Sequence, residues 1–424
     1  MIVQNIYDAL WATATPLLKR HLQKRVVIDK EDEARLGERF GVASQPRPAG
    51  KLVWLHGASV GESVALLTVV AKLRAAPNPP TVLVTTGTVT SARIMGDRLP
   101  EGCLHQFLPL DRRAWVEHFL DHWRPDGVVW SESEIWPGVL AGLKRRHIPA
   151  IMLNARLSAK TVRNWRYFRP WMRGLLSAFS HVFAQTEVDR RNWQELGGQP
   201  AQVLGNLKFV VPELPFDAEK LALLHTEIGN RPLWVFSSIH PGEEEIGGRV
   251  HQQLKQTHSD LLTVIVPRHP HRGAEFADHL RAQGMTVAQR SKQEPIRSNT
   301  DIYLADTIGE MGLFYRLGKI VAMGGSFVPH GGQNPIEPAK LKGAILYGPH
   351  MFNFTAICAA FEAAQSVLPV ANDHELAEKI AWLLATPHEA AAFGEKAWAV
   401  TQSEAGSLDK IWAAIADWRG KVLG

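Results

Sequence analysis

The sequence predicts an α/β protein built of two doubly wound domains, each a parallel sheet with helices on both faces. First, short apolar segments alternate with longer helical segments from residue 51 onward. Second, these apolar segments lack the in–out alternation of half-exposed strands, which indicates strands buried on both faces. Third, the proline-containing segment 209–215 interrupts the alternation once, which marks a linker between two halves. A chain of 424 residues has the length for two such domains.

The first 25 residues predict a helix of their own. Apolar residues recur there at helical spacing, and basic residues follow: Ile2, Val3, Ile6, Leu10, Trp11, Ala14, Leu17 and Leu18, then Lys19, Arg20, Lys24 and Arg25. The stretch is too short to span a bilayer. An amphipathic helix lying in a membrane interface fits the pattern, with its basic flank toward anionic lipid. A helix docked on the protein's own surface satisfies the same apolar stripe equally well.

The elements of the first domain, expected at 26–211, follow in order. Strands are predicted at 52–55, 81–85, 127–130, 148–154 and 182–185, and helices at 62–75, 91–98 and 137–146. Each predicted strand is a short apolar run bounded by turn residues.

The second domain, expected at 216–395, repeats the pattern. Strands are predicted at 233–237, 262–267, 301–304, 319–323 and 343–346, and helices at 241–256 and 309–316. The tail is helical in pattern, and the helix at 396–424 is expected to pack back on the first domain. Because ligands bind at the carboxyl ends of strands in such sheets, two facing domains would enclose a central cleft.

Composition and charge narrow the choice of partners. A net charge of +5 favours anionic partners such as a nucleotide, a phospholipid surface or nucleic acid. The basic residues are scattered and no recognised nucleic-acid module occurs, so no nucleic-acid partner is expected. Cys103 and Cys358 provide neither a disulfide framework nor a zinc spacing, and the N-terminus lacks the features of a signal peptide, so a cytoplasmic compartment is expected.

The glycine-rich segment 324–339 is the most informative motif. An apolar strand leads into it, and Asn334 as the cap with Pro335 in the first turn predicts the start of a helix. Glycines let backbone N–H groups approach a phosphate, and Glu337 suits the hydroxyls of a ribose, so the segment is typical of a nucleotide site. A plain strand–turn–helix with a capping box of Asn334 and Glu337 explains the same spacing as well.

Residues 54–63 place a carboxylate at the end of the first strand. Glu62 opens a helix whose positive end and N–H groups would keep the carboxylate ionised, so that it could take a proton from a substrate hydroxyl. Taken alone, a carboxylate that only complements the helix dipole is the commoner explanation. Residues 57–61 also match G-x-S-x-G, which leaves an esterase using Ser59 as a further alternative, although such an elbow ordinarily follows several strands.

Three more charged residues follow predicted strands or precede the linker. Glu132 and Glu134 would point to opposite sides of an extended chain, and Glu132 is preferred as the cleft carboxylate. Lys208 could neutralise a departing phosphate or a substrate carboxylate, although most such lysines are surface residues.

Two loops of the second domain complete the candidates. Arg268 offers a guanidinium fork for phosphate, whereas His269 and His271 make a weak metal pair without a carboxylate partner, so no metal is expected. The loop 306–311 is a further candidate for contact with an anion or a base. The absence of G-x-x-x-x-G-K-[ST], and of G-x-G-x-x-G after the first strand, disfavours kinases, ATPases and dehydrogenases.

Taken together, six segments resemble one family, in order and over nearly the whole chain. They are residues 56–62, 132–137, 154–158, 205–208, 267–270 and 324–337. The family is the 3-deoxy-D-manno-octulosonic acid (Kdo) transferases of Gram-negative bacteria, which act on lipid A precursors. The resemblance implies a GT-B glycosyltransferase at the cytoplasmic face of the inner membrane. Its N-terminal domain would bind the lipid acceptor, and its C-terminal domain would bind CMP-Kdo.

By this resemblance Glu62 is the base that deprotonates the acceptor hydroxyl, and Glu132 and Lys208 stabilise the transition state. Contacts with CMP would come from Pro267, Arg268, Gly309, Glu310, Met311, Asn334 and Glu337. The reaction would invert the anomeric centre and need neither a metal nor a cofactor, because CMP-Kdo is the donor substrate. The alternative with the same fold is another nucleotide-sugar enzyme, either a different transferase or an epimerase.

The sequence departs from the family pattern at a few positions. Gln333 stands where histidine is usual, and Ile239 stands where threonine is usual. Lys160 and Thr161 replace the usual arginine and serine. These departures bear on fine contacts with the donor and acceptor.

Overall fold

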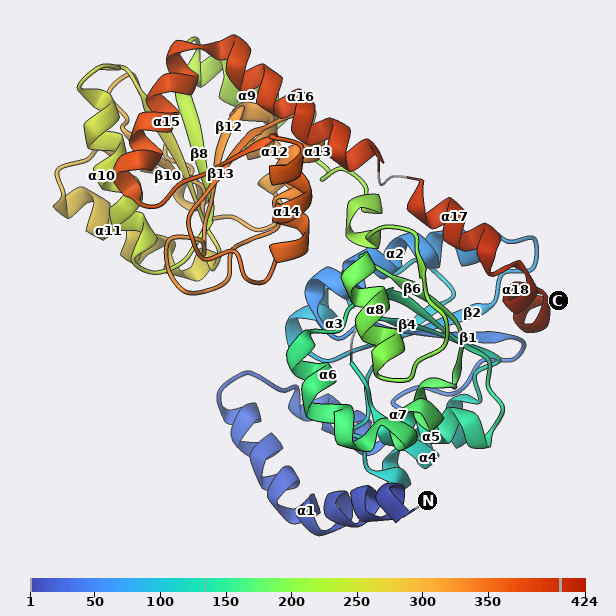
Figure 1. The fold of residues 1–424 in the computed structure, drawn as a ribbon. Coiled ribbons are helices and arrows are strands. Elements are labelled where there is room, and N and C mark those ends of the chain that lie inside the picture. Colours follow the sequence, from blue (N-terminus) through green and yellow to red (C-terminus); the bar gives the residue numbers. More distant parts are fainter. Residues whose placement is uncertain (1, 133, 404–405) are drawn as a thin grey trace. The chain divides into compact units, whose positions relative to one another are not determined.

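The computed structural model describes residues 2–132, 134–403 and 406–424, and these residues form two compact units (Figure 1). Unit 1 comprises Met1–Val211 and Glu404–Gly424, and unit 2 comprises Pro212–Ser403. The junction between the units lies inside the segment 209–215, where the prolines predicted a linker. The expected boundary at 395/396 instead falls within helix α16 (Pro387–Ser403), which belongs to unit 2 along its whole length.

Within the described part of unit 1, seven parallel strands form one sheet, in the order β3-β2-β1-β4-β5-β6-β7. They are β1 (Leu52–His56), β2 (Thr81–Thr86), β3 (Cys103–Phe107), β4 (Gly127–Ser131), β5 (Ala150–Ala155), β6 (Phe179–Ala184) and β7 (Gln202–Val203). The strand order reverses between β1 and β4. The carboxyl ends of these two neighbours therefore form the switch point where α/β sheets bind ligands.

The helices of unit 1 come from both parts of the chain. They are α1 (Ile2–Val27), α2 (Val60–Arg74), α3 (Val89–Arg98), α4 (Arg113–Trp123), α5 (Pro137–Arg145), α6 (Ala159–Trp165), α7 (Arg169–Leu176), α8 (Glu187–Glu195), α17 (Ser407–Ala414) and α18 (Ala416–Leu423), with the short 3-10 helices η1 (Glu33–Phe40), η2 (Arg166–Phe168) and η3 (Leu207–Val210). Figure 1 shows the dark-red helices α17 and α18 beside the blue and green elements of this unit.

The sheet of unit 1 separates two hydrophobic cores. Because side chains alternate along a strand, Trp54 of β1 enters one core, and its neighbours Val53 and Leu55 enter the other. The first core is covered by α4, α5, α7 and α8, and the Trp54 ring lies 4.7 Å from that of Phe119 on α4. The second core is covered by α2 and α3, and residues of α17 and α18 complete it.

The C-terminal helices pack closely on the sheet of unit 1. A Cβ atom built on Gly127 of β4 would lie 2.6 Å from Val422 and 2.8 Å from Trp418, so this position accepts only glycine. The indole nitrogen of Trp418 also donates to the carbonyl of Pro149, at 3.2 Å. Helix α18 is therefore part of the fold of unit 1.

Helix α1 is docked along one side and exposed along another. Its Tyr7 hydroxyl donates to Asp111 at 2.7 Å, and Trp171 of α7 donates to Gln4 at 3.1 Å. Apolar side chains remain in solvent, with Ile2 77% and Leu17 72% exposed. Pro16 lies inside the helix, which changes direction along its length in Figure 1. Among the described residues, no helix is long and apolar enough to cross a membrane.

Unit 2 repeats the architecture. Its described strands form a seven-stranded parallel sheet in the order β10-β11-β9-β8-β12-β13-β14. They are β8 (Leu233–Ile239), β9 (Leu262–Pro267), β10 (Val287–Gln289), β11 (Ile302–Leu304), β12 (Ile320–Met323), β13 (Ala344–Tyr347) and β14 (Val367–Pro369). The switch point of this sheet lies at the carboxyl ends of β8 and β12.

The helices of unit 2 lie between these strands and after them. They are α9 (Ala218–Ile228), α10 (Glu243–Lys255), α11 (Gly273–Ala282), α12 (Met311–Leu317), α13 (Ile336–Lys340), α14 (Thr355–Ala363), α15 (Asp373–Ala385) and α16. A hydrophobic core of unit 2 covers one face of its sheet and includes Trp234 and Phe236 of β8, with α10, α11 and α15 packed on them.

Candidate active site

The switch point of unit 1 brings the sequence-predicted carboxylates together. Glu62 lies in the first turn of α2, directly after β1, and Glu132 follows β4, the strand beside β1. Both residues are largely buried, each with 9% of its surface exposed. Lys208 reaches the same place from η3, since a Cβ atom on Gly61 would lie 3.8 Å from its side chain.

Glu62 is held by the loop that precedes its helix. The backbone N–H of Ala58 donates to Glu62 Oε2 at 2.8 Å, and the Ser59 hydroxyl donates to Oε1 at 2.7 Å. Ser59 is also the N-cap of α2. The carboxylate is thus fixed in orientation at the edge of the sheet.

The direction of the Glu62 pKa differs from the sequence expectation. The helix end and nearby N–H groups were expected to favour the ionised form, and these donors are present. Burial, followed by the negative charge of Glu132, outweighs them and raises the pKa of Glu62 above its usual value. A carboxylate with a raised pKa is a stronger base when it is ionised.

Glu132 forms an ion pair with Lys208. The distance from Lys208 Nζ to Glu132 Oε1 is 2.6 Å, and Asn154 Nδ2 donates to the same oxygen at 3.2 Å. Glu132 and Asn154 both adopt left-handed backbone conformations, with φ of 59° and 56°. Such conformations are uncommon for residues other than glycine and gather at functional sites. Lys208 is therefore a paired lysine, with 17% of its side chain exposed, and not a free surface residue.

Asn154 is a site residue that the sequence reasoning did not single out. Its Oδ1 accepts the backbone N–H of Leu207 at 3.1 Å, so it joins the end of β5 to the turn that carries Lys208. Gln185 in turn donates to the Asn154 carbonyl at 3.0 Å. Its position in the sequence could have indicated this role, because Asn154 ends a predicted strand and begins one of the six family-like segments.

Glu134 lies in a different environment from Glu132. Its Oε2 accepts from the indole nitrogen of Trp136 at 2.8 Å and lies 3.5 Å from His56 Nε2. Burial opposes ionisation, but these partners outweigh it and lower the pKa of Glu134. The two carboxylates were expected to point to opposite sides of an extended chain. The backbone of Glu132 is in the left-handed conformation instead, so the chain is not extended there. Ser133 lies outside the described residues.

Ser59 lacks the surroundings of a hydrolytic nucleophile. Its hydroxyl donates to Glu62 and caps α2, and in the described part of the chain no hydrogen bond joins it to a histidine. An activated serine needs such a base within reach. The geometry therefore disfavours the esterase alternative.

In unit 2, basic side chains gather at the carboxyl ends of β8, β9 and β12. Pro267 ends β9, and Arg268 follows with an exposed side chain. The ring of His240 stacks on that of His330 at 4.2 Å, and the ring of His269 lies 5.9 Å away. Burial, then His330, His269 and Arg268, lowers the pKa of His240 to about 4. The positive charge of Arg268 favours an anion at this place.

The loop before α12 contains three predicted contacts with CMP. Gly309 has φ of 83°, and Met311 begins α12. The Glu310 carboxylate is bound by Arg290, which donates at 2.8 Å, and by Lys220 at 3.1 Å. The hydrogen bonds from Arg290 are the main cause that lowers the pKa of Glu310 to about 2. The Glu310 side chain is therefore ionised and anchors its own loop.

The helix after the glycine-rich segment begins one residue later than predicted. Asn334 was expected as the cap with Pro335 in the first turn, but α13 begins at Ile336. The Asn334 side chain still accepts the Ile336 N–H, at 3.2 Å. Burial, followed by the charge of Glu337, raises the pKa of Tyr315 on α12, so Glu337 lies near that tyrosine.

The glycine-rich turn itself does not present all of its amides to a phosphate, which corrects a sequence expectation. The N–H groups of Gly325 and Phe327 donate to the buried carboxylate of Glu243, and the Gly332 N–H donates to the Gly325 carbonyl at 2.8 Å. These donors are satisfied within the protein, two of them by the acidic side chain of α10 and the third by a carbonyl of the turn itself. A phosphate bound at this turn would therefore need other donors.

No cluster of three or more His, Cys, Asp or Glu side chains suited to a metal ion occurs among the described residues. His269 and His271 lie with ring centroids 5.7 Å apart. The independence from a metal stays a prediction from the sequence.

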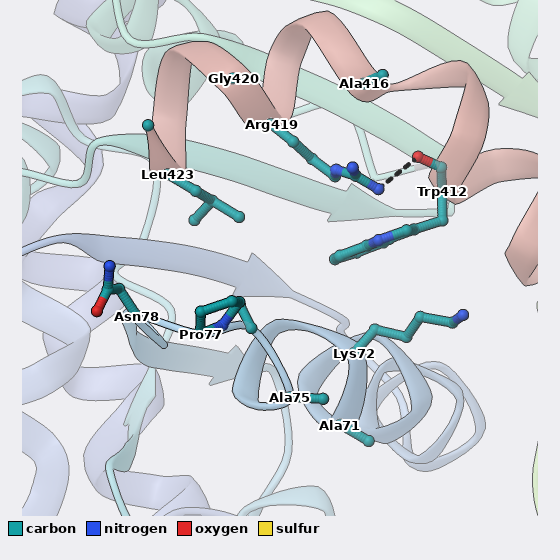
Figure 2. A pocket seen from close by; sticks show the side chains of 12 residues that line it. Ala71, Lys72, Ala75, Pro77, Asn78, Trp412, Ala416, Arg419, Gly420 and Leu423 are labelled. Carbon is teal, nitrogen blue, oxygen red and sulfur yellow. Dashed lines mark hydrogen bonds between the residues drawn. The ribbon is translucent and has the colours of Figure 1, made fainter.

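A separate cavity of about 860 Å³ lies at the far end of α2 (Figure 2). It is lined by Ala71 and Lys72 on that helix and by Trp412, Arg419 and Leu423 on the C-terminal helices. Lys72 is ten residues from Glu62, or about 15 Å along the helix axis. The cavity therefore does not belong to the carboxylate site.

Comparison with known proteins identifies relatives of the chain. Residues 34–211 match the sequence model of a family described as 3-Deoxy-D-manno-octulosonic-acid transferase (kdotransferase). A probable mitochondrial 3-deoxy-D-manno-octulosonic acid transferase of Arabidopsis thaliana is 35% identical over 398 residues, which cover 91% of this chain and 89% of the relative. The 3-deoxy-D-manno-octulosonic acid transferase of Haemophilus influenzae is 30% identical over 414 residues, or 96% of each chain.

A solved structure shares the fold. A glycosyltransferase from Rickettsia africae superimposes with a TM-score of 0.57 at 13% identity, covering 88% of this chain and 99% of that one. The two doubly wound units thus form a GT-B fold, which confirms the fold class predicted from the sequence.

Proposed function

The chain belongs to the Kdo transferase family and is a glycosyltransferase, and on this premise we propose that it moves Kdo from CMP-Kdo to a lipid A precursor with inversion at the anomeric carbon. The observation that carries the proposal is the group of Glu62, Glu132 and Lys208 at the switch point of unit 1. It combines a buried base with a fixed positive charge, which is what this transfer requires.

In the proposed reaction, Glu62 accepts the proton of the acceptor hydroxyl. The hydroxyl oxygen then forms a bond to the anomeric carbon of Kdo, and the bond from that carbon to the phosphate oxygen breaks. CMP leaves with the electron pair. The raised pKa of Glu62 suits it to take this proton. Lys208, oriented by Glu132, opposes the negative charge that develops as the phosphate departs.

Unit 2 would hold the donor. Arg268 supplies positive charge next to the carboxyl end of β9, and the nearby histidine rings offer nitrogen atoms that can bond to a phosphate or to the Kdo carboxylate. Asn334 and Glu337 offer polar groups to the nucleoside. Mass analysis of the product formed from a lipid A precursor and CMP-Kdo tests the function. A product heavier by one or more Kdo units supports it, and transfer only from a UDP-sugar would favour another GT-B enzyme.

Arg268→Ala is expected to weaken CMP binding by about 10- to 100-fold, because a charge-assisted hydrogen bond to phosphate is lost. Calorimetric titration of the full chain with CMP measures the effect. Arg272→Ala is a matched control on the same loop, because Arg272 is already engaged by Glu275. An unchanged affinity in Arg268→Ala would remove Arg268 from the site.

We further propose that unit 1 contacts an anionic membrane, at the cytoplasmic face of the bacterial inner membrane. The contacting surface is α1 together with residues 159–176, here called the basic–aromatic surface. Trp171 and Tyr7 join its two parts, with ring centroids 5.8 Å apart. Tyr167 is 75% and Phe168 44% exposed, and exposed cations surround them: Lys160, Arg163, Arg166, Arg169 and Arg173. Aromatic rings and cations together suit a lipid headgroup layer.

The double variant Ile6→Asp/Leu10→Asp is expected to lower binding to anionic vesicles by roughly tenfold or more per residue, because each apolar side chain would lose its burial in lipid. Both side chains are more than half exposed, so the fold should tolerate the change. Leu223→Asp, on α9 of unit 2 and 60% exposed, is the control. Equal vesicle sedimentation of the double variant and the control would refute the assignment of α1.

A further inference from the structure

A buried carboxylate of unit 2 ties two loops together. Glu243, the first residue of α10, has 0% of its surface exposed. Its Oε2 accepts the backbone N–H of His240 at 2.8 Å and that of Gly325 at 2.7 Å, while Oε1 accepts the N–H of Phe327 at 3.0 Å. One side chain thus joins the loop after β8 to the glycine-rich turn after β12.

These contacts form part of a closed circuit of hydrogen bonds. The Gly325 carbonyl accepts the Gly332 N–H at 2.8 Å. The next residue, Gln333, bonds through its side chain to His240 Nε2 at 3.0 Å, and the His240 N–H returns to Glu243. The circuit lies directly after the carboxyl ends of β8 and β12, which form the switch point of the sheet. Asn334 follows directly, so the circuit fixes the chain immediately before the predicted nucleotide contacts.

A general preference of helix N-termini for acids does not explain this placement. The sequence has three successive glutamates at the start of α10, and they have three different environments. Glu244 accepts the Gly242 N–H at 2.7 Å and lies 3.1 Å from His279, both outside the circuit. Glu245 is exposed. Only Glu243, among these three described residues, contacts the glycine-rich turn.

We propose that Glu243 is a positioning residue of the donor site. Its carboxylate holds the glycine-rich turn against the loop after β8 and so sets the place of Asn334 and Glu337. The inference rests on the proposed function, because it assigns a role at the site proposed for CMP-Kdo. Glu243 binds backbone groups and not the donor, so its effect on transfer passes through the residues that it places.

The first test needs no donor. In Glu243→Gln, the amide nitrogen of the new side chain faces backbone N–H groups and cannot accept them, so part of the circuit is lost. Amide hydrogen exchange of residues 324–333, followed by mass spectrometry on the full chain, is expected to accelerate about 10- to 100-fold, the loss typical of bonds to a charged acceptor. Exchange at the wild-type rate would overturn the proposal.

The second test separates positioning from stability. Glu244→Gln is the matched control, because Glu244 is also buried and also loses a backbone bond. Glu243→Gln is expected to raise the KM for CMP-Kdo about tenfold, and Glu244→Gln to change it less than about twofold. Equal KM changes in the two variants would overturn the positioning role. A wild-type protein that does not use CMP-Kdo would refute the proposed donor, and the exchange measurement would still decide the contact.

Discussion

Replacing Glu62 by glutamine is expected to lower kcat for Kdo transfer by about 10²–10⁴-fold while leaving the affinity for CMP unchanged. Glutamine keeps the size of the side chain and one oxygen that can accept the Ala58 N–H, but it cannot take a proton from the acceptor hydroxyl. The loss should therefore appear in kcat. Steady-state assays with a lipid A precursor, together with calorimetric titration by CMP, measure the two quantities.

Glu187→Gln is the matched control for Glu62→Gln. Glu187 is also an acid in the first turn of a helix of unit 1, but its side chain is 63% exposed and pairs with Arg190. If Glu62, like Glu187, only complemented the dipole of its helix, the two variants would have similar kcat values. Transfer by Glu62→Gln at a near-normal rate would show that the base is assigned wrongly.

Lys208→Met should lower kcat by about 10²–10³-fold, the range for loss of one preorganised group that stabilises developing charge. The ammonium group lies 2.6 Å from Glu132 and beside the first turn of α2, and methionine fills similar space without the charge. The expected loss exceeds that for Arg268→Ala because the role proposed for Lys208 is in the transition state, whereas the role proposed for Arg268 is in binding.

Lys208→Met should also shift the pH dependence of kcat/KM in a defined direction. With Lys208 removed, the negative charge of Glu132 is no longer compensated, so the pKa of Glu62 rises further. Glu62 acts as a base only above its pKa, and the acidic limb of the kcat/KM profile therefore moves to higher pH. Glu132→Gln removes that charge and should move the limb to lower pH.

The double variant Lys208→Met/Glu132→Gln separates catalysis from folding. It removes both members of the ion pair, so Glu132 is not left without its partner as it is in Lys208→Met, and the stability of the double variant should exceed that of the single variant. Its acidic limb should return to lower pH, because the charge that raised the pKa of Glu62 is gone. Its kcat should stay low, because the positive charge is still missing. Recovery of kcat would mean that Lys208 serves only to neutralise Glu132.

Apolar runs in the sequence predicted the inner strands of both sheets but not the edge strands. The unpredicted strands are β3, β7, β10 and β14, and each lies at an edge of its sheet. An edge strand has a neighbour on one side only, so it needs no continuous apolar run; β3, for example, is partly exposed over Cys103, Leu104 and His105. Inner strands such as β1 are buried at every residue, and that burial is what the apolar runs recorded.

The candidate site was predictable where it depends on strand ends. Glu62 and Glu132 follow neighbouring strands, so the pattern of a doubly wound sheet was enough to place them together. The roles of Asn154 and Glu243 depend on hydrogen bonds to residues more than 50 positions away, which no local pattern contains. For the same reason, the amides of the glycine-rich turn looked free for a phosphate in the sequence and are partly occupied in the fold.

The late return of the chain to unit 1 has a consequence for biosynthesis. One face of the unit 1 sheet is completed by Leu408, Ile411, Trp418 and Val422, which the ribosome adds only after all of unit 2. Until then, this apolar face of nascent unit 1 lacks the helices that cover it. The part of the protein that is translated first is thus the last to mature.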